Sequence, residues 1–392
     1  MSLTQAEKDE LVSTVSRTLA TTPYHCSSLT QLTNGTTNFV YRGQLIQPIC
    51  GDSGNEKEKE ITTVIVKYST DYAAANKNLP LDVSRAYYEE AMLTSLKDMP
   101  SSTVSVKAPR LFYSNRVPSI HVLEDFPAAV DLKSLYVLSP GAITPSISEA
   151  IGRDVGSWLR SYHDWGFTRL EEGVVGLGTN EPMRKLKFDF TYGKFLHVLE
   201  QNFPALVTTD YRSALEQVRD QATVRDQATE EFANSSPRAG GDWGLIHGDF
   251  WTGNILLASD PSSSASATGA KLFVVDWEYA QFGHRAYDLG QLIGDLYERK
   301  HFSEAKGAVP AIEGFIEGYG AFDNELAFRT AIHADVQLIG WYTRRAPNAP
   351  LRFPLETVTE AMRIGRDWIV KGGLRDNEYF KTSPLASLFK RT

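Results

Sequence analysis

Cysteine is scarce in this chain, and long apolar runs are absent. Its 392 residues include two cysteines, Cys26 and Cys50, and neither lies in a CxxC pair or in a cysteine–histidine spacing typical of metal sites. The cysteines therefore predict no zinc or redox motif, and a reducing cytoplasm is the expected location. No apolar stretch is long enough to cross a bilayer, so no membrane partner is expected. The first residues lack a basic segment followed by an apolar one, so no signal peptide is expected.

An excess of positive charge is also missing. The formal net charge is -8, which argues against a nucleic-acid partner. The same charge makes a cationic or neutral small substrate easier to accept than a polyanion. The pattern GxxxxGK[ST] does not occur, and its absence excludes a Walker-type nucleotide enzyme.

Strand patterns dominate the first third of the chain. Residues 61–68 form the clearest one, and Lys67 stands near its end. The helix pattern that follows places Glu89 on the inward stripe. A buried glutamate needs a cation, and Lys67 is the available partner. A solvated strand end is the alternative interpretation for Lys67.

Residues 32–42 predict a strand, a turn and a second strand, with Asn34-Gly35 as the turn. The small hydroxyl and amide side chains here would allow backbone amides to approach a phosphate. An ordinary hairpin explains the same residues.

Two further strand patterns, at residues 109–113 and 119–124, precede Pro127, which cannot continue a strand ladder. Beyond this point the chain changes to helical periodicity, and a chain of this length is expected to form two lobes. The sequence therefore predicts lobes at residues 1–126 and 127–392.

The most informative stretch is residues 247–254, with the pattern H-x-D-x-x-x-x-N. Apolar residues flank it on both sides, so a polar loop at strand ends is predicted. A second apolar run ends at Asp276. A carboxylate, an amide and a second carboxylate at strand ends are suited to hold magnesium and a phosphate beside a hydroxyl. A polar hairpin turn that only caps backbone groups is the alternative. Asp288, after a glycine turn near a helix start, is expected to brace the loop.

The order of these parts is that of a protein-kinase-like fold. The predicted class is α+β and bilobal, with an N-terminal antiparallel β-sheet lobe containing one main helix and a larger, mostly helical C-terminal lobe. Residues 247–254 resemble the catalytic signature of aminoglycoside phosphotransferases, choline/ethanolamine kinases and fructosamine kinases. Residues 276–290 and 34–38 are similar to the metal-binding segment and the nucleotide loop of choline-type kinases.

The resemblance implies ATP and Mg²⁺ as cofactors and a role for each matching residue. Asp249 would accept the proton of a substrate hydroxyl or orient that hydroxyl. Asn254 and Asp276 would hold Mg²⁺ against the phosphates of ATP. Lys67 would contact the α- and β-phosphates and be steadied by Glu89.

The remaining implied roles concern nucleotide binding and support of the loop. The backbone of Glu124 and Phe126 would pair with adenine. His247 would support the loop, and Glu278 would help at the metal or substrate site. The residues implied in the nucleotide loop are Asn34, Thr36, Thr37 and Asn38.

Two departures from protein kinases indicate the substrate class. Protein kinases carry arginine between the histidine and aspartate of this loop, where the chain has Gly248, and no Ala-Pro-Glu segment follows Asp276. A small molecule with a hydroxyl group is therefore the expected substrate. An amino-alcohol, a sugar or ketosamine, and an aminoglycoside all stay open, as does the oligomeric state.

Two other functions compete with this hypothesis. A metal-dependent hydrolase would use residues 247–249 and 276–278, but it lacks a histidine cluster and gives Lys67 and Glu89 no role. A catalytically inactive nucleotide-binding protein would retain the fold without the reaction.

Overall fold

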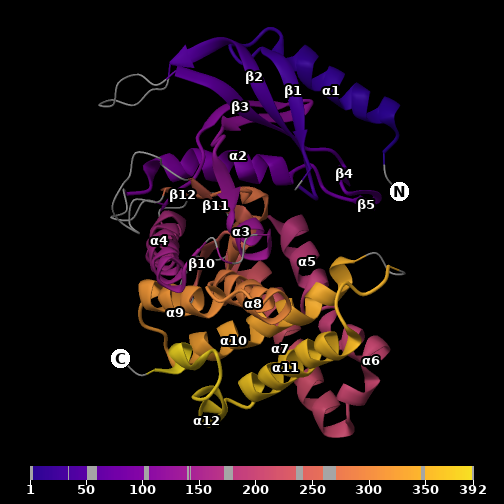
Figure 1. The fold of residues 1–392 in the computed structure, drawn as a ribbon, viewed down its shortest axis with the longest axis vertical. Helices are drawn as coiled ribbons and strands as arrows, with labels where there is room; N and C mark the ends of the chain where they lie inside the picture. The colour runs from indigo at the N-terminus through magenta and orange to yellow at the C-terminus, as the bar shows by residue number, and fades with distance from the viewer. Residues whose placement is uncertain are drawn as a thin grey trace. The chain divides into compact units, whose positions relative to one another are not determined.

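The structure is a computed structural model in which the chain forms two compact units (Figure 1). It describes residues 3–33, 35–50, 60–100, 106–138, 141, 143–171, 180–234, 242–258, 271–345 and 349–390. Unit 1 comprises Met1–Asp98 and Ala108–Ala128, and unit 2 comprises Met99–Lys107 and Ala129–Thr392. The predicted α+β class, with an antiparallel N-terminal sheet and a mostly helical remainder, is confirmed.

Unit 1 is built around a five-stranded antiparallel sheet in the order β1-β2-β3-β8-β7. Its strands are β1 (Cys26–Leu32), β2 (Phe39–Cys50), β3 (Glu60–Tyr68), β7 (Leu111–Arg116) and β8 (Ser119–Glu124), and a two-stranded ladder joins β4 (Tyr72–Ala73) to β5 (Asn76–Pro80). The helices of the described part of this unit are α1 (Gln5–Leu19) and α2 (Arg85–Ser95), where the sequence predicted one main helix.

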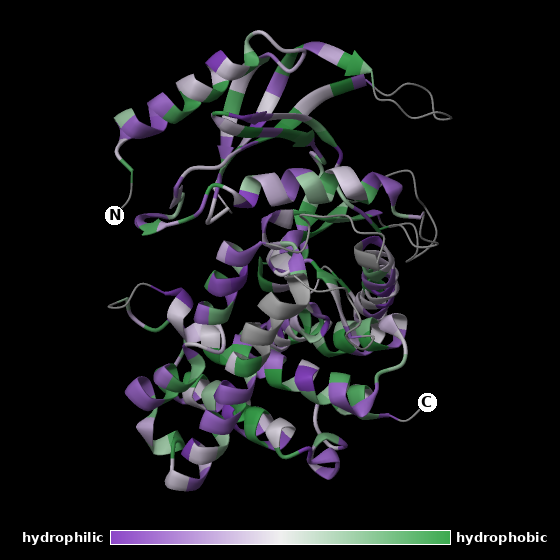
Figure 2. Ribbon diagram, turned by 180° about the vertical axis from the view of Figure 1, so that it is seen from behind, coloured by the Kyte–Doolittle hydropathy of each residue, from purple (hydrophilic) through white to green (hydrophobic). Residues whose placement is uncertain are grey.

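Alternation along β3 decides which face of the sheet carries the core. Val64 and Val66 pack with Val15 and Leu19 of α1 in one apolar cluster. Helix α1 is mainly polar, with a few apolar residues among the polar ones (Figure 2), as expected for a helix that buries a single stripe. Because side chains alternate along a strand, Lys67 lies on the opposite face from Val64 and Val66.

Unit 2 is mostly helical. Its helices are α3 (Leu132–Leu138), α4 (Pro145–Glu171), α5 (Glu181–Phe190), α6 (Phe195–Asn202), α7 (Thr209–Asn234), α8 (Ala286–Ser303), α9 (Ala308–Tyr319), α10 (Asn324–Gly340), α11 (Leu355–Gly373) and α12 (Asn377–Phe380). Helices α4 and α9 approach closely, since a Cβ added at Gly314 would lie 2.0 Å from the Glu149 carbonyl oxygen. Among the described residues, no helix is both long and apolar enough to cross a membrane.

Short strands in unit 2 hold two loops against each other. Strand β10 (Trp243–Ile246) pairs with β13 (Gln281–His284), and β11 (Ile255–Ala258) pairs with β12 (Lys271–Val274). Strands β6 (Val106–Lys107) and β9 (Ala129–Asp131) complete the second sheet, in the order β6-β12-β11-β9. Residues 247–254 connect β10 to β11, and residues 275–280 connect β12 to β13. The predicted polar loop at strand ends is confirmed, and α8 begins just before Asp288, as expected. Strand β13 occupies the position of the predicted glycine turn.

Candidate active site

Lys67 and Glu89 form a buried ion pair in unit 1. The Lys67 Nζ–Glu89 Oε1 distance is 2.8 Å, and the side chains are 6% and 1% exposed. His121 on β8 adds a further contact, with its Nδ1 3.6 Å from Glu89 Oε2. Burial alone would raise the pKa of the Glu89 carboxyl, but Lys67 and His121 outweigh it and hold the pKa at about 2. The carboxylate is therefore ionised at neutral pH and fixes the lysine.

The turn between β1 and β2 has a different arrangement from a two-residue hairpin, because residues 33–38 separate the strands. The carbonyl oxygens of Thr36 and Thr37 accept hydrogen bonds from Ala75 and Ala74, at 2.9 and 3.2 Å. Asn38 is buried, and its Oδ1 accepts a hydrogen bond from Arg85 on α2 at 3.0 Å.

Asn38 therefore ties the end of the turn to α2, while Thr36 is exposed. Asn34, also predicted for the nucleotide loop, lies outside the described residues.

Glu124 and Phe126 lie at and just beyond the end of β8. The Glu124 N–H donates to the Arg110 carbonyl at 2.9 Å, and its carboxylate contacts the Arg110 guanidinium at 3.2 Å. The backbone N–H of Glu124 is therefore already paired within unit 1. Between the two residues, Asp125 forms a two-bond ion pair with Arg42, at 2.8 and 3.1 Å.

Asp249 receives donors on both carboxylate oxygens. Its Oδ1 accepts from Gln291 Nε2 at 2.6 Å and from Lys187 Nζ at 3.2 Å. Its Oδ2 accepts from Asn254 Nδ2 at 3.2 Å. Burial would raise the pKa of Asp249, but Lys187 and Gln291 hold it below its ordinary value. The side chain is 24% exposed, so an ionised and accessible carboxylate stands in the loop.

Asn254 and Asp276 lie at the same end of the β11–β12 hairpin. Ile255 pairs with Val274, and the Val275 N–H donates to the Asn254 carbonyl at 3.0 Å. Asp276 follows directly, in the left-handed region with φ 70°. Aspartate adopts this region more readily than most residues, and such backbone conformations concentrate at functional sites. The hairpin thus brings an amide and a carboxylate to one place.

His247 and Gly248 shape the loop backbone. His247 is buried, its Nδ1 accepts from the Asp249 N–H at 3.2 Å, and its Nε2 donates to the Val275 carbonyl at 3.1 Å. Burial lowers the pKa of His247, so the ring is neutral and links the two loops. Gly248 has φ +80°, and a Cβ there would lie 2.2 Å from the Tyr279 carbonyl oxygen.

Helix α8 holds the loop at three points along one face. Asp288 accepts from the His247 and Gly248 N–H groups at 2.8 and 2.9 Å. Gln291 contacts Asp249, and Asp295 accepts from the Thr252 N–H at 3.3 Å and from its hydroxyl. The three side chains follow i, i+3, i+7 spacing, which places them on one side of a helix.

Asp288 is also connected to helices α4 and α9, through hydrogen bonds of His163. His163 Nε2 lies 3.0 Å from Asp288 Oδ2, and its Nδ1 lies 2.9 Å from the Tyr319 hydroxyl. Burial lowers the pKa of His163, with Asp288 opposing that shift. Glu278 is also buried, and its carbonyl accepts from Asn180 Nδ2 at 2.7 Å.

Several contacts of the predicted site residues, in each unit, were not expected from the sequence. Lys187 and Gln291 at Asp249, Asp295 at Thr252, and His121 at Glu89 all come from other elements. For Gln291 and Asp295 a signal existed, because both share the helical face of Asp288. Nothing in the local sequence distinguishes Lys187 from its neighbour Lys185, which is exposed and pairs with Glu181.

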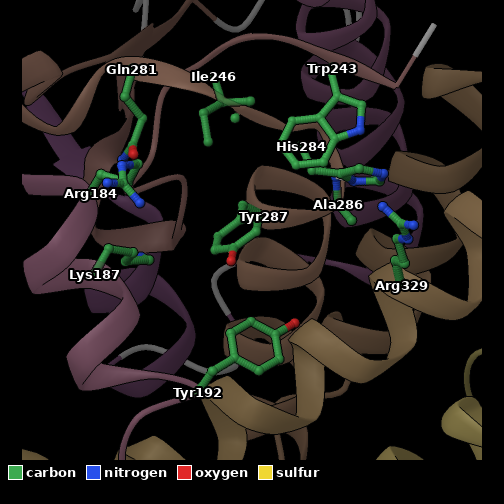
Figure 3. Close-up of a pocket in the computed structure, with 11 residues that line it drawn as sticks. Arg184, Lys187, Tyr192, Trp243, Ile246, Gln281, His284, Ala286, Tyr287 and Arg329 are labelled. Atoms are coloured by element: carbon green, nitrogen blue, oxygen red, sulfur yellow. The ribbon is translucent and has the colours of Figure 1, made fainter. Parts of the chain in front are cut away.

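A small cavity of about 30 Å³ lies next to Lys187 (Figure 3). Figure 3 shows Arg184 and Lys187 projecting from α5 on one side of it, and Trp243, His284 and Arg329 on the other. None of the described residues lining it is acidic. Its volume suits about one or two water molecules, so it is too small to be a complete substrate pocket.

The chain matches known proteins over most of its length. The sequence model of the phosphotransferase enzyme family (APH) matches residues 102–329, more than half of the chain. Phosphotransferase FrzJ of Cladobotryum sp is 28% identical over 407 residues, covering 100% of this chain and 99% of that protein. The 4-hydroxytryptamine kinase of Psilocybe cyanescens is 21% identical over 295 residues, covering 74% of this chain and 73% of that protein.

A solved structure, that of a microcompartment-associated aminopropanol kinase, has 14% sequence identity. The match covers 97% of this chain and 100% of that one, with a TM-score of 0.48.

Proposed function

Because the chain belongs to the phosphotransferase enzyme family, we propose that it transfers the terminal phosphoryl group of ATP, with Mg²⁺, to a hydroxyl of a small molecule. The observation that carries this proposal is the loop of residues 247–254. It presents an ionised, accessible Asp249 in contact with Asn254, and Asp276 lies at the same hairpin end. In this role Asp249 orients the hydroxyl and receives its proton as the phosphoryl group is transferred.

The donor set at the hairpin end fits magnesium. Asn254 offers an amide oxygen and Asp276 a carboxylate, and Mg²⁺ commonly takes one or two carboxylates and fills its other positions with water and phosphate oxygens. The described residues contain no cluster of three or more histidine, cysteine or acidic side chains that would form a full protein cage. When bound, the metal neutralises charge on the phosphates. Glu278 is proposed to support this segment.

Unit 1 supplies the proposed nucleotide contacts. Lys67, held by Glu89, would bind the α- and β-phosphates, because the buried carboxylate fixes the position of the ammonium group. The backbone at Glu124 and Phe126 would pair with adenine, and the turn containing Thr36 and Thr37 would cover the phosphates.

The acceptor is tested with the purified full-length chain, Mg·ATP and a panel of hydroxyl compounds. The name of the Psilocybe relative gives 4-hydroxytryptamine as its substrate, so this compound joins choline, a ketosamine, a sugar and an aminoglycoside in the panel. ATP consumption and phosphorylated product are followed together. We expect phosphate transfer to at least one compound only when ATP is present.

Asp249→Ala is expected to abolish that transfer, since it removes the group that orients the hydroxyl. Asp210→Ala, at an exposed position of α7, is the matched control and should retain wild-type turnover. Product formation unaffected by Asp249→Ala would refute the role of this residue. ATP binding without turnover of any compound would favour the inactive nucleotide-binding protein, and conversion without ATP would favour the hydrolase.

A further inference from the structure

Lys187 and Gln291 close a triangle of hydrogen bonds on Asp249. Lys187 Nζ lies 3.2 Å from Asp249 Oδ1 and 2.6 Å from Gln291 Oε1, and Gln291 Nε2 lies 2.6 Å from the same Asp249 oxygen. The lysine comes from α5 and the glutamine from α8, so two helices converge on one carboxylate oxygen.

The Lys187 side chain is 8% exposed, which is unusual for an ammonium. Burial of a charged group is costly unless an opposite charge and hydrogen-bond acceptors surround it. Asp249 and Gln291 supply both. Burial lowers the pKa of Lys187, and Asp249 opposes the shift, so the lysine depends on this carboxylate.

The triangle also constrains Asp249. Two donors hold Oδ1 from one side, and the Asn254 amide contacts Oδ2 at 3.2 Å. These contacts restrict the rotamer of the carboxylate, and Oδ2, which has one amide donor, keeps acceptor capacity for an approaching hydroxyl. Phosphoryl transfer depends mostly on positioning, so a shift of this oxygen by 1 Å has a large effect on rate.

We propose that Lys187, together with Gln291, is a positioning residue that fixes the orientation of Asp249 for phosphoryl transfer. The proposal rests on the proposed function, in which Asp249 serves the acceptor hydroxyl. Helix α5 thereby contributes to the reaction through a residue outside the loop of residues 247–254.

The kinetic test uses Lys187→Met, which removes the charge and keeps an unbranched chain of similar length. The reaction is Mg·ATP with the panel compound that wild-type protein phosphorylates fastest. We expect kcat to fall about 10- to 100-fold, because Asp249 loses its orientation, with KM for ATP changing less than about twofold. Lys187→Arg, which retains the cation, should recover part of kcat.

Lys185→Met is the matched control on the same helix. Lys185 is 58% exposed and pairs with Glu181, so wild-type kinetics are expected. If Lys187→Met does not fold at the assay temperature, Gln291→Met removes the other donor to the same oxygen and should show the same fall in kcat. A fall in kcat for Lys185→Met equal to that for Lys187→Met, or unchanged kcat in Lys187→Met, would overturn the proposal.

A second measurement does not depend on turnover. Amine acetylation of the folded full-length protein, read by mass spectrometry, gives the labelling of Lys187 relative to Lys185. In Asp249→Asn the ammonium loses its charged partner, so more neutral amine forms and the ratio should rise at least about threefold. An unchanged ratio would show that the ion pair does not exist in solution. If no panel compound is phosphorylated but the ratio rises, the ion pair stands and the proposed function fails.

Discussion

Gly248 holds a conformation that a side chain would disturb in two ways. Its φ of +80° belongs to the left-handed region, and a Cβ would lie 2.2 Å from the Tyr279 carbonyl oxygen. The carbonyl is backbone and cannot swing away as a side chain would. The sequence identified Gly248 as a departure from protein kinases, and the structure adds the physical reason for a glycine here.

Gly248→Ala should therefore displace the neighbouring Asp249 and lower kcat by about 100-fold or more. The melting temperature should also fall, because the left-handed conformation costs about 1–2 kcal/mol and the clash adds to it. Gly320→Ala measures the cost of the left-handed conformation without a clash, because Gly320 has φ +92° but open space around its Cβ position. Equal losses of melting temperature in both variants would contradict the predicted clash with Tyr279.

At the scale of elements, α8 acts as a rigid support for the loop of residues 247–254. Its side chains at Asp288, Gln291 and Asp295 contact successive parts of that loop. Asp295 is itself held by Arg299 at 2.6 Å, and this pairing outweighs burial and lowers the pKa of its carboxyl. Because both Asp295 and Thr252 are buried, their contact is shielded from water.

Thr252→Val tests this support without changing side-chain volume much. Asp295 would lose its hydroxyl donor while staying buried, so the free energy of unfolding should fall by about 1–3 kcal/mol. Thr252→Ser retains the hydroxyl and should lose clearly less. Denaturant unfolding measures both, and equal losses in the two variants would argue that the methyl packing, not the hydrogen bond, matters at this position.

Elements with a strong local pattern were predictable from the sequence, and those set by distant pairing were not. Strand β3 and helix α2 show clear alternation or helical spacing, and both occur where predicted. Strand β13 was not predicted, because the glycine at Gly283 indicated a turn before a helix. Its extended form depends on pairing with β10, a contact that no local pattern contains.

At the scale of the whole molecule, the same distinction applies to the candidate site. Asp249 and Asn254 belong to one short motif, and the contact between Lys67 and Glu89 follows from one strand and the next helix. Lys187 lies 62 positions before Asp249, on a helix whose sequence has no motif. Physical proximity of this kind depends on tertiary packing, so only the structure reveals it.

If the proposed function holds, magnesium binding is expected to depend on the nucleotide as well as on the protein, because the proposed metal site has two side-chain ligands. Asn254 and Asp276 would provide two oxygen donors at one hairpin end, which is too few to hold Mg²⁺ tightly without phosphate. Magnesium alone at millimolar concentration should therefore leave the melting temperature unchanged, whereas Mg·ATP should raise it, since a ligand that binds only the folded chain stabilises it.

Chelation by EDTA should reverse the magnesium-dependent part of that rise and stop phosphate transfer. Asp276→Asn should remove the same part of the rise, because it replaces the charged ligand, while the weaker effect of ATP alone remains. Glu304→Gln, at an exposed position beyond the end of α8, is the control for loss of one carboxylate. A full Mg·ATP shift in Asp276→Asn would place the metal elsewhere and overturn the assignment of this residue.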